Sequence, residues 1–157
     1  MVPANEKYMI EKKYILLTVS IAVSLLMLLG ATWLSETLYY ECDFSNEMYN
    51  AHLYLPSLTV VVVAAWAIMG IYYYVLNSVV FSRWYHWLVV VALTIVAVYY
   101  INVEHIGGAF YDMDMDFERE TSQYCAVLAV CEAVLCTAVS FGIRWWSSNC
   151  RHTPFPE

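Results

Sequence analysis

Four long apolar stretches constrain this chain more than any other feature of its sequence. They cover residues 14–34, 57–81, 84–102 and 124–145. Each is close to the length of about 20 apolar residues that a helix needs to cross a bilayer. The whole chain is 62% hydrophobic and only 13% charged, whereas soluble domains average roughly 45–50% apolar and about 25% charged residues. The sequence therefore predicts an all-α integral membrane protein, with a single four-helix transmembrane bundle over residues 1–157.

The positions of the basic residues predict how this bundle is oriented. Lys and Arg accumulate on the cytosolic side of spanning helices. Six of the seven lie near the termini or between the second and third apolar stretches: Lys7, Lys12, Lys13, Arg83, Arg144 and Arg151. Only Arg119 lies elsewhere. We therefore expect both termini in the cytosol, and the loops 35–56 and 103–123 on the outer side of the membrane.

The composition and motifs exclude several classes of function. Seven Lys and Arg residues provide no basic patch for nucleic acid. The four histidines do not form the pattern of a metal or haem site, and no nucleophile–base motif is visible. We therefore expect a protein that is not an enzyme and that holds no cofactor or metal.

The first outer loop contains the motif Leu38-Tyr39-x-x-Cys42, shortly after Trp33. This motif resembles the Leu-Trp-x-x-Cys signature of the claudin and peripheral myelin protein superfamily, whose members are four-helix membrane proteins with cytosolic termini. Tyr39 replaces the usual Trp, and the loop lacks the second cysteine that braces an extracellular β-sheet in claudins. The resemblance implies a plasma-membrane, cell-junction role and a small extracellular β-element. MARVEL-type four-helix proteins have a similar topology. Tyr39 and Tyr40 are candidate partner contacts.

Three cysteines are candidates for covalent modification. Cys42 lies in the first outer loop, and Cys125 begins the fourth apolar stretch on the same side of the membrane. In an oxidising compartment they can form a disulfide, and the alternative is two free thiols. Cys150 follows the fourth stretch on the cytosolic side. It is a candidate for palmitoylation, with a plain free thiol as the alternative.

The second outer loop alternates acidic and apolar side chains. The acidic positions are Asp112, Asp114 and Asp116, and the apolar positions are Met113, Met115 and Phe117. An extended segment places the two sets on opposite faces, so we expect a strand-like edge that docks on a basic partner. One alternative is a solvated acidic loop. The other is a calcium loop, although Phe117 replaces its glycine and Gln123 its final Glu.

Glu132 lies in the middle of the fourth apolar stretch. A carboxyl group at this depth normally faces protein or water rather than lipid. We expect a neutral side chain that hydrogen-bonds to Ser24, to Thr94 or to a neighbouring subunit. The alternative is a working acid that relays protons or cations.

Together these features predict a tetraspan interaction protein of the plasma membrane. It would act through its acidic outer loops on other membrane proteins, as a cell-junction or adhesion component or as an auxiliary subunit of a larger complex. The alternatives are a small channel or transporter subunit that uses Glu132, and an accessory subunit of a membrane enzyme.

Overall fold

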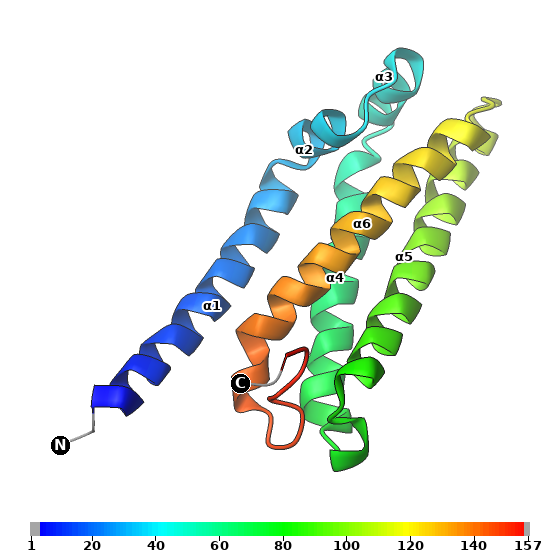
Figure 1. The fold of residues 1–157 in the computed structure, drawn as a ribbon. Helices are drawn as coiled ribbons and strands as arrows, with labels where there is room; N and C mark the ends of the chain where they lie inside the picture. Colours follow the sequence, from blue (N-terminus) through cyan, green and yellow to red (C-terminus); the bar gives the residue numbers. More distant parts are fainter. Residues whose placement is uncertain (1–3, 156–157) are drawn as a thin grey trace.

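Four long helices lie side by side and form the body of the molecule (Figure 1). The computed structural model describes the backbone of residues 4–155 and the side chains of residues 12–155. The long helices are α1 (Ala4–Leu29), α4 (Tyr54–Gly70), α5 (Trp84–Asp112) and α6 (Glu118–Ile143). The predicted all-α four-helix bundle is confirmed.

These helices are long and apolar enough to cross a membrane. The candidate spans are Lys12–Leu29, Tyr54–Leu76, Trp84–Asp112 and Glu118–Trp146. The last two contain 29 residues each, which is about 43 Å at 1.5 Å per residue, whereas the hydrocarbon core of a bilayer is about 30 Å thick. By length and composition the chain is a multi-pass membrane protein, and α5 and α6 extend beyond the hydrocarbon.

The connection between α5 and α6 is shorter than the sequence predicted. Most of the predicted loop 103–123 is helical, and the chain turns within residues 113–117. Asp114 adopts the left-handed conformation, with a φ of 57°, which Asp tolerates better than most residues. Glu118 and Glu120 lie in the first turn of α6, where acidic side chains favour the positive end of the helix dipole. The predicted strand-like edge is therefore wrong.

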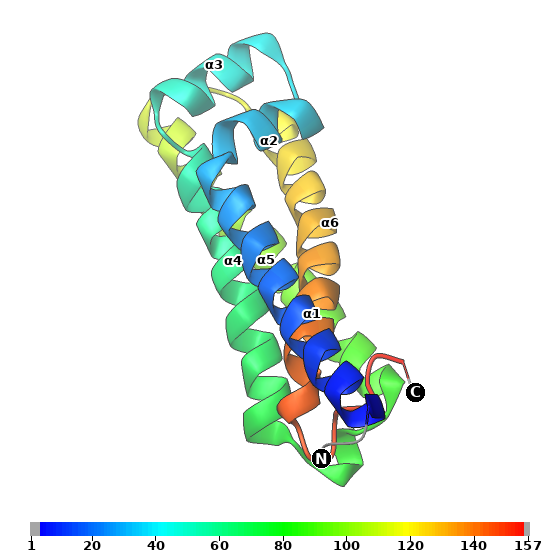
Figure 2. The same ribbon diagram turned by 90° about the vertical axis from the view of Figure 1, so that its left-hand side faces the viewer.

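The first outer loop is helical as well. It forms α2 (Ala31–Leu38) and α3 (Cys42–Asn50), which lie across one end of the bundle (Figure 2). Glu41 caps α3, because its Oε2 accepts a hydrogen bond of 2.9 Å from the Phe44 backbone N–H. The Ser45 hydroxyl accepts one of 3.1 Å from the Glu41 N–H. The described residues contain no strand, so the small extracellular β-element implied by the claudin resemblance is wrong.

Helix α6 is the central helix of the bundle and contacts α1, α4 and α5. It meets α1 at Gly142, where an added Cβ atom would lie 2.7 Å from the Ser20 hydroxyl oxygen. That hydroxyl donates a hydrogen bond of 2.7 Å to the carbonyl oxygen of Ala138. The absence of a side chain at Gly142 therefore allows α1 and α6 to approach closely.

The segment after α6 folds back against the end of the bundle opposite α2 and α3 (Figure 1). The second apolar stretch, predicted as a helix to residue 81, ends its helix earlier. A π-helix over Ile71–Leu76 follows α4, and the chain then turns at Asn77. The Asn77 side-chain oxygen accepts hydrogen bonds from the Ser147 hydroxyl (2.8 Å) and the Asn149 N–H (2.9 Å). The Tyr73 hydroxyl donates to the Thr153 carbonyl at 3.1 Å. These bonds attach the C-terminal segment to the π-helix that follows α4 and to its C-cap Asn77.

Candidate functional site

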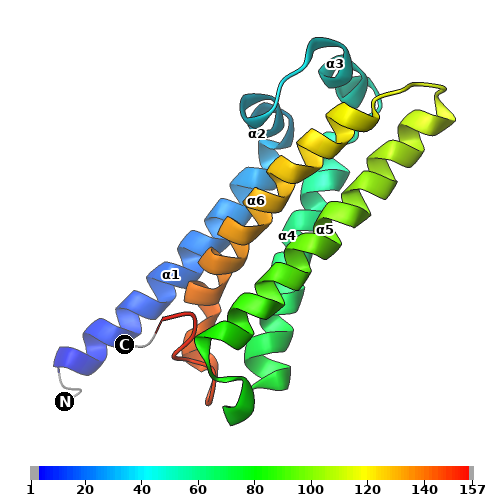
Figure 3. The same ribbon diagram turned by 45° about the vertical axis from the view of Figure 1, so that its right-hand side comes forward.

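Helices α2 and α3 and the α5–α6 turn lie at one end of the bundle (Figure 3), and most acidic residues of the chain belong to these elements or to the adjoining turns of α5 and α6. We call this end the outer end, because the positive-inside rule places it away from the cytosol. Its ten acidic residues are Glu36, Glu41, Asp43, Glu47, Glu104, Asp112, Asp114, Asp116, Glu118 and Glu120. Its one basic residue, Arg119, forms a 2.6 Å ion pair with Glu120. Burial raises the pKa of Tyr39 above its usual value, and the negative charges of Glu120 and Glu41 raise it further.

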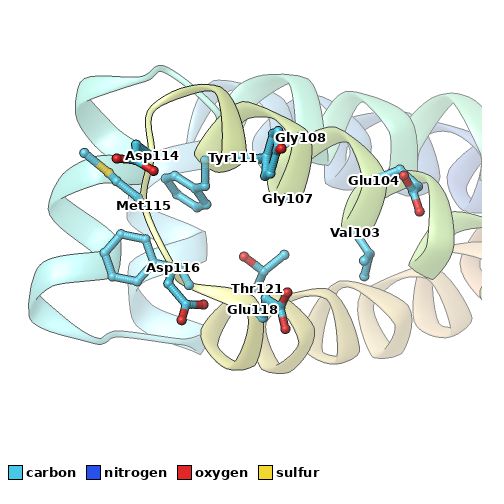
Figure 4. A pocket seen from close by; sticks show the side chains of 12 residues that line it. Val103, Glu104, Gly107, Gly108, Tyr111, Asp114, Met115, Asp116, Glu118 and Thr121 are labelled. Atoms are coloured by element: carbon cyan, nitrogen blue, oxygen red, sulfur yellow. The ribbon is translucent and has the colours of Figure 1, made fainter.

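A cavity of about 620 Å³ lies between the last turns of α5 and the first turns of α6 (Figure 4). Four carboxylates line it: Glu104, Asp114, Asp116 and Glu118. The remaining lining residues are Val103, Gly107, Gly108, Phe110, Tyr111, Met115, Phe117 and Thr121. The cavity therefore combines acidic side chains with an apolar and aromatic wall, and we call it the acidic cavity.

The structure brings together only part of the predicted partner-binding set. Those lining the acidic cavity are Asp114, Met115, Asp116 and Phe117. Asp112 and Met113 are exposed but do not line it, and Tyr40 is exposed on the connection between α2 and α3. The half-buried Tyr39 donates a 2.9 Å hydrogen bond to the side-chain oxygen of Gln123. Tyr39 therefore holds the first outer segment against α6.

An aromatic cluster supports the outer end, and Phe44 is at its centre. The Phe44 ring is completely buried. Its centroid lies 5.6 Å from that of Phe110, 5.9 Å from that of Phe117 and 5.9 Å from that of Tyr124. Phe117, which the sequence assigned to a partner surface, is half-buried and packs against this cluster.

Sequence reasoning missed Thr121, Glu104 and the two glycines of the acidic cavity. Thr121 is 3% exposed, and among the described residues its hydroxyl oxygen has no hydrogen-bond partner. Glu104, Gly107, Gly108 and Tyr111 follow the i, i+3, i+4, i+7 spacing of one helix face. That spacing could have placed the four residues on one face of a helix. The prediction of a loop at these positions prevented this interpretation.

The acidic side chains do not form a compact metal site. Within the described part of the chain, no three His, Cys, Asp or Glu side chains are grouped so that they could hold a metal ion. Asp112 is the last residue of α5, and Asp114 and Asp116 follow it in the turn. The helix end prevents the continuous looped backbone that the calcium alternative requires.

Glu132 is completely buried in α6. Its Oε1 accepts a 3.1 Å hydrogen bond from the Cys136 thiol, one turn along the same helix. Neither predicted mate hydrogen-bonds to it. The Ser24 hydroxyl donates to the Ser20 carbonyl and accepts from the indole N–H of Trp66, and the Thr94 hydroxyl donates to the Val90 carbonyl. Ser and Thr in helices commonly bond the carbonyl four residues earlier, which explains why these predicted contacts are wrong.

Glu132→Met is expected to leave the free energy of unfolding unchanged or to raise it by about 1 kcal/mol, since an unsatisfied buried polar group is costly. The reason is that, within the described structure, Glu132 Oε2 has no partner. Denaturant unfolding in detergent micelles measures the change, with the buried Leu135→Met as a control for side-chain volume. A loss above about 2 kcal/mol in Glu132→Met alone would show that the carboxyl group has a strong partner.

The structure places the three cysteines that were candidates for modification. Cys42 is exposed, Cys125 is completely buried, and both are free thiols, so the structure has the unpaired alternative rather than the disulfide. Cys150 is also completely buried. It lies in the folded-back C-terminal segment, and its thiol lies 3.8 Å from the Ser78 carbonyl oxygen. Palmitoylation at Cys150 would require this segment to detach from the bundle, and it stays a prediction.

Cys150 is expected to react with maleimide at least about tenfold more slowly than Cys42 in the solubilised native protein, because thiol reactivity follows exposure and thiolate content. Burial also raises the pKa of Cys150, which reduces its thiolate fraction. Mass spectrometry of the alkylated peptides gives both rates, and denatured protein provides the control in which both thiols react. Equal rates in the native protein would contradict the buried C-terminal segment.

Comparisons with models of protein families, with curated proteins and with solved structures found no match for this chain. The claudin-like resemblance therefore stays a prediction.

Proposed function

We propose that this chain is a non-enzymatic tetraspan membrane protein that recognises a basic partner at the plasma membrane. It acts as an auxiliary subunit of a larger membrane complex or as a cell-junction component. The proposal rests on the charge of the outer end, where ten acidic residues accompany the single basic residue Arg119. Such a field attracts positively charged surfaces and raises the rate of encounter with them.

The packing of the outer end favours recognition by a preformed surface. α2 and α3 are held to the bundle by the buried Phe44 ring and by a 2.9 Å hydrogen bond between the Ser35 and Tyr124 hydroxyls. Side chains that are fixed before binding lose less conformational entropy when a partner arrives. The likeness of Leu38-Tyr39-x-x-Cys42 to the claudin signature favours the junction role.

The alternative of a channel or transporter subunit has less support. It requires Glu132 to exchange protons or cations with water. Glu132 is instead completely buried, and its one hydrogen bond in the described structure is to Cys136 on the same helix.

Affinity purification in mild detergent tests the proposed function. The triple variant Asp114→Asn, Asp116→Asn, Glu118→Gln is expected to reduce recovery of co-purifying membrane proteins at least about tenfold, which corresponds to 1.4 kcal/mol of binding free energy. A second variant makes the same change of charge on α2 and α3, with the substitutions Glu36→Gln, Asp43→Asn and Glu47→Gln, and separates recognition at the acidic cavity from recognition by the charge of the whole outer end. A lone monomer from the wild type, or equal recovery with the cavity variant, would contradict the proposal.

A further inference from the structure

Thr121 differs from most other threonines in the helices of this protein. Five donate their hydroxyl to the carbonyl oxygen four residues earlier: Thr18, Thr37, Thr59, Thr94 and Thr137. The Thr121 side chain makes no such bond, although the residue is buried, with an exposed fraction of only 3%. Figure 4 shows it directed into the acidic cavity. A buried hydroxyl group without a partner is uncommon in proteins, so its orientation indicates that the cavity receives a polar ligand.

The charges that line the cavity around this hydroxyl select a cation. Asp116 and Glu118 come from the turn and from α6, and Glu104 comes from α5 at the other end of the cavity (Figure 4). An anion would be repelled by these carboxylates. The nearest basic side chain in sequence, Arg119, is already paired with Glu120.

The spacing of the acids favours an organic cation over a metal ion. The described residues contain no group of three His, Cys, Asp or Glu side chains placed to hold a metal. The cavity volume of about 620 Å³ is also far larger than a metal ion requires, and falls in the range of sites for organic ligands, roughly 300–1,000 Å³. A guanidinium or alkyl ammonium group can contact separate carboxylates and donate to a hydroxyl at the same time.

The remaining walls suit the carbon stem of such a group. Val103, Phe110 and Met115 provide apolar surface, and Tyr111 provides an aromatic ring at the rim. Aromatic faces attract cations, and the stems of Lys and Arg pack on apolar surface. Gly107 contributes no side chain to the α5 wall. A Cβ atom added there would meet no heavy atom within 4 Å, so the space beside it is open.

We propose that the acidic cavity binds one guanidinium or alkyl ammonium group, with carboxylates around the charge and the Thr121 hydroxyl as a hydrogen-bond acceptor inside the cavity. The source that fits the charge of the outer end is an Arg or Lys side chain on the outer segment of the partner. This choice of source rests on the proposed function. A free polyamine carries the same chemistry, and the test separates the two.

Isothermal titration of the full chain in nanodiscs tests this site with four probes. They are acetyl-arginine methylamide, its uncharged citrulline counterpart, spermidine and calcium chloride. The arginine probe is expected to bind, and the citrulline probe to bind at least about tenfold more weakly, because it lacks the charge. The double variant Asp116→Asn, Glu118→Gln is expected to weaken the arginine probe about tenfold, and Thr121→Val about fivefold, the loss typical of one hydrogen bond.

Two further variants keep the test independent of folding defects. Asp112→Asn removes one charge from the same segment but outside the cavity, and it is expected to change the affinity less than about twofold at ordinary salt. Gly107→Leu adds bulk to the cavity wall and is expected to abolish binding while the thermal midpoint is retained. Thr121→Val removes an unpartnered hydroxyl, so a purely structural role predicts equal or higher stability and unchanged affinity.

The outcomes distinguish the cavity from the proposed function. Binding of the arginine probe that follows this variant pattern supports the site, and tighter binding of spermidine with the same pattern assigns it to free polyamines. No binding of either organic cation overturns the site, as does calcium binding alone. If the probes bind but partner recovery is unchanged in the cavity variants, the site stands and the proposed function fails. If recovery depends on the outer acids while the probes do not bind, the proposed function stands and the site fails.

Discussion

Phe44→Ala is expected to lower the free energy of unfolding by about 3–5 kcal/mol, the usual cost of removing a large buried aromatic ring. Phe44 is completely buried. Its ring contacts Tyr39, and also one aromatic ring on α5 and two on or next to α6. Loss of the ring therefore leaves a void where the two outer helices meet the bundle. Denaturant unfolding in detergent measures the total effect, and limited proteolysis shows whether α2 and α3 detach first.

A nearby tyrosine provides the control for Phe44→Ala. Tyr40 is 64% exposed, so Tyr40→Ala is expected to change the free energy of unfolding by less than about 0.5 kcal/mol, as surface substitutions usually do. If Phe44→Ala costs as little as the control, the aromatic cluster does not hold the outer end together.

Gly142→Val is expected to destabilise the bundle by about 1–3 kcal/mol, the usual range for overpacking. Even the first added carbon would lie 2.7 Å from the Ser20 hydroxyl oxygen and 3.4 Å from the Leu16 carbonyl oxygen. The Ser20 side chain must move or the helices must separate, and either change weakens the hydrogen bond from Ser20 to the Ala138 carbonyl. Thermal unfolding in nanodiscs measures the loss, and crosslinking between cysteines introduced on α1 and α6 reports their separation.

Gly70→Val is the matched control, because it is also a glycine in a spanning helix. A Cβ atom added at Gly70 meets no heavy atom within 4 Å. Its expected cost stays below about 1 kcal/mol, within the range of helix propensity differences. Equal losses in the two variants would contradict the close approach of α1 and α6 at Gly142.

The number of spanning helices could be predicted from sequence, but the extent of two of them could not. Apolar length alone defines a span, because a bilayer imposes the same thickness on every helix. The ends of α5 and α6 depend on local geometry outside the hydrocarbon. Glu104 and the Gly107-Gly108 pair suggested a loop, yet the backbone stays helical to Asp112. Helix geometry tolerates a glycine at a cost of about 1 kcal/mol, which packing can offset.

The charge of the candidate site could be predicted from the sequence, but its shape could not. The acids of the second loop marked the outer end, and Asp114 and Asp116 do line the cavity. Alternation suggested a strand, whereas the segment is a turn in which Phe117 packs against Phe110, with a centroid distance of 5.1 Å. Thr121 and Glu104 line the same cavity only because α5 and α6 pair side by side, so no local pattern could place the two together.

Photo-crosslinking at the rim of the acidic cavity tests most directly whether the outer end recognises a basic partner. Tyr111 is 84% exposed and lines the cavity, while Tyr100 is 61% exposed on the same helix and does not line the cavity. Benzoylphenylalanine at Tyr111 is expected to give a protein adduct of defined mass whose yield falls as salt screens the charges, and at Tyr100 to give no such adduct. Identical adducts at both positions, or none at Tyr111, would contradict recognition through the outer end.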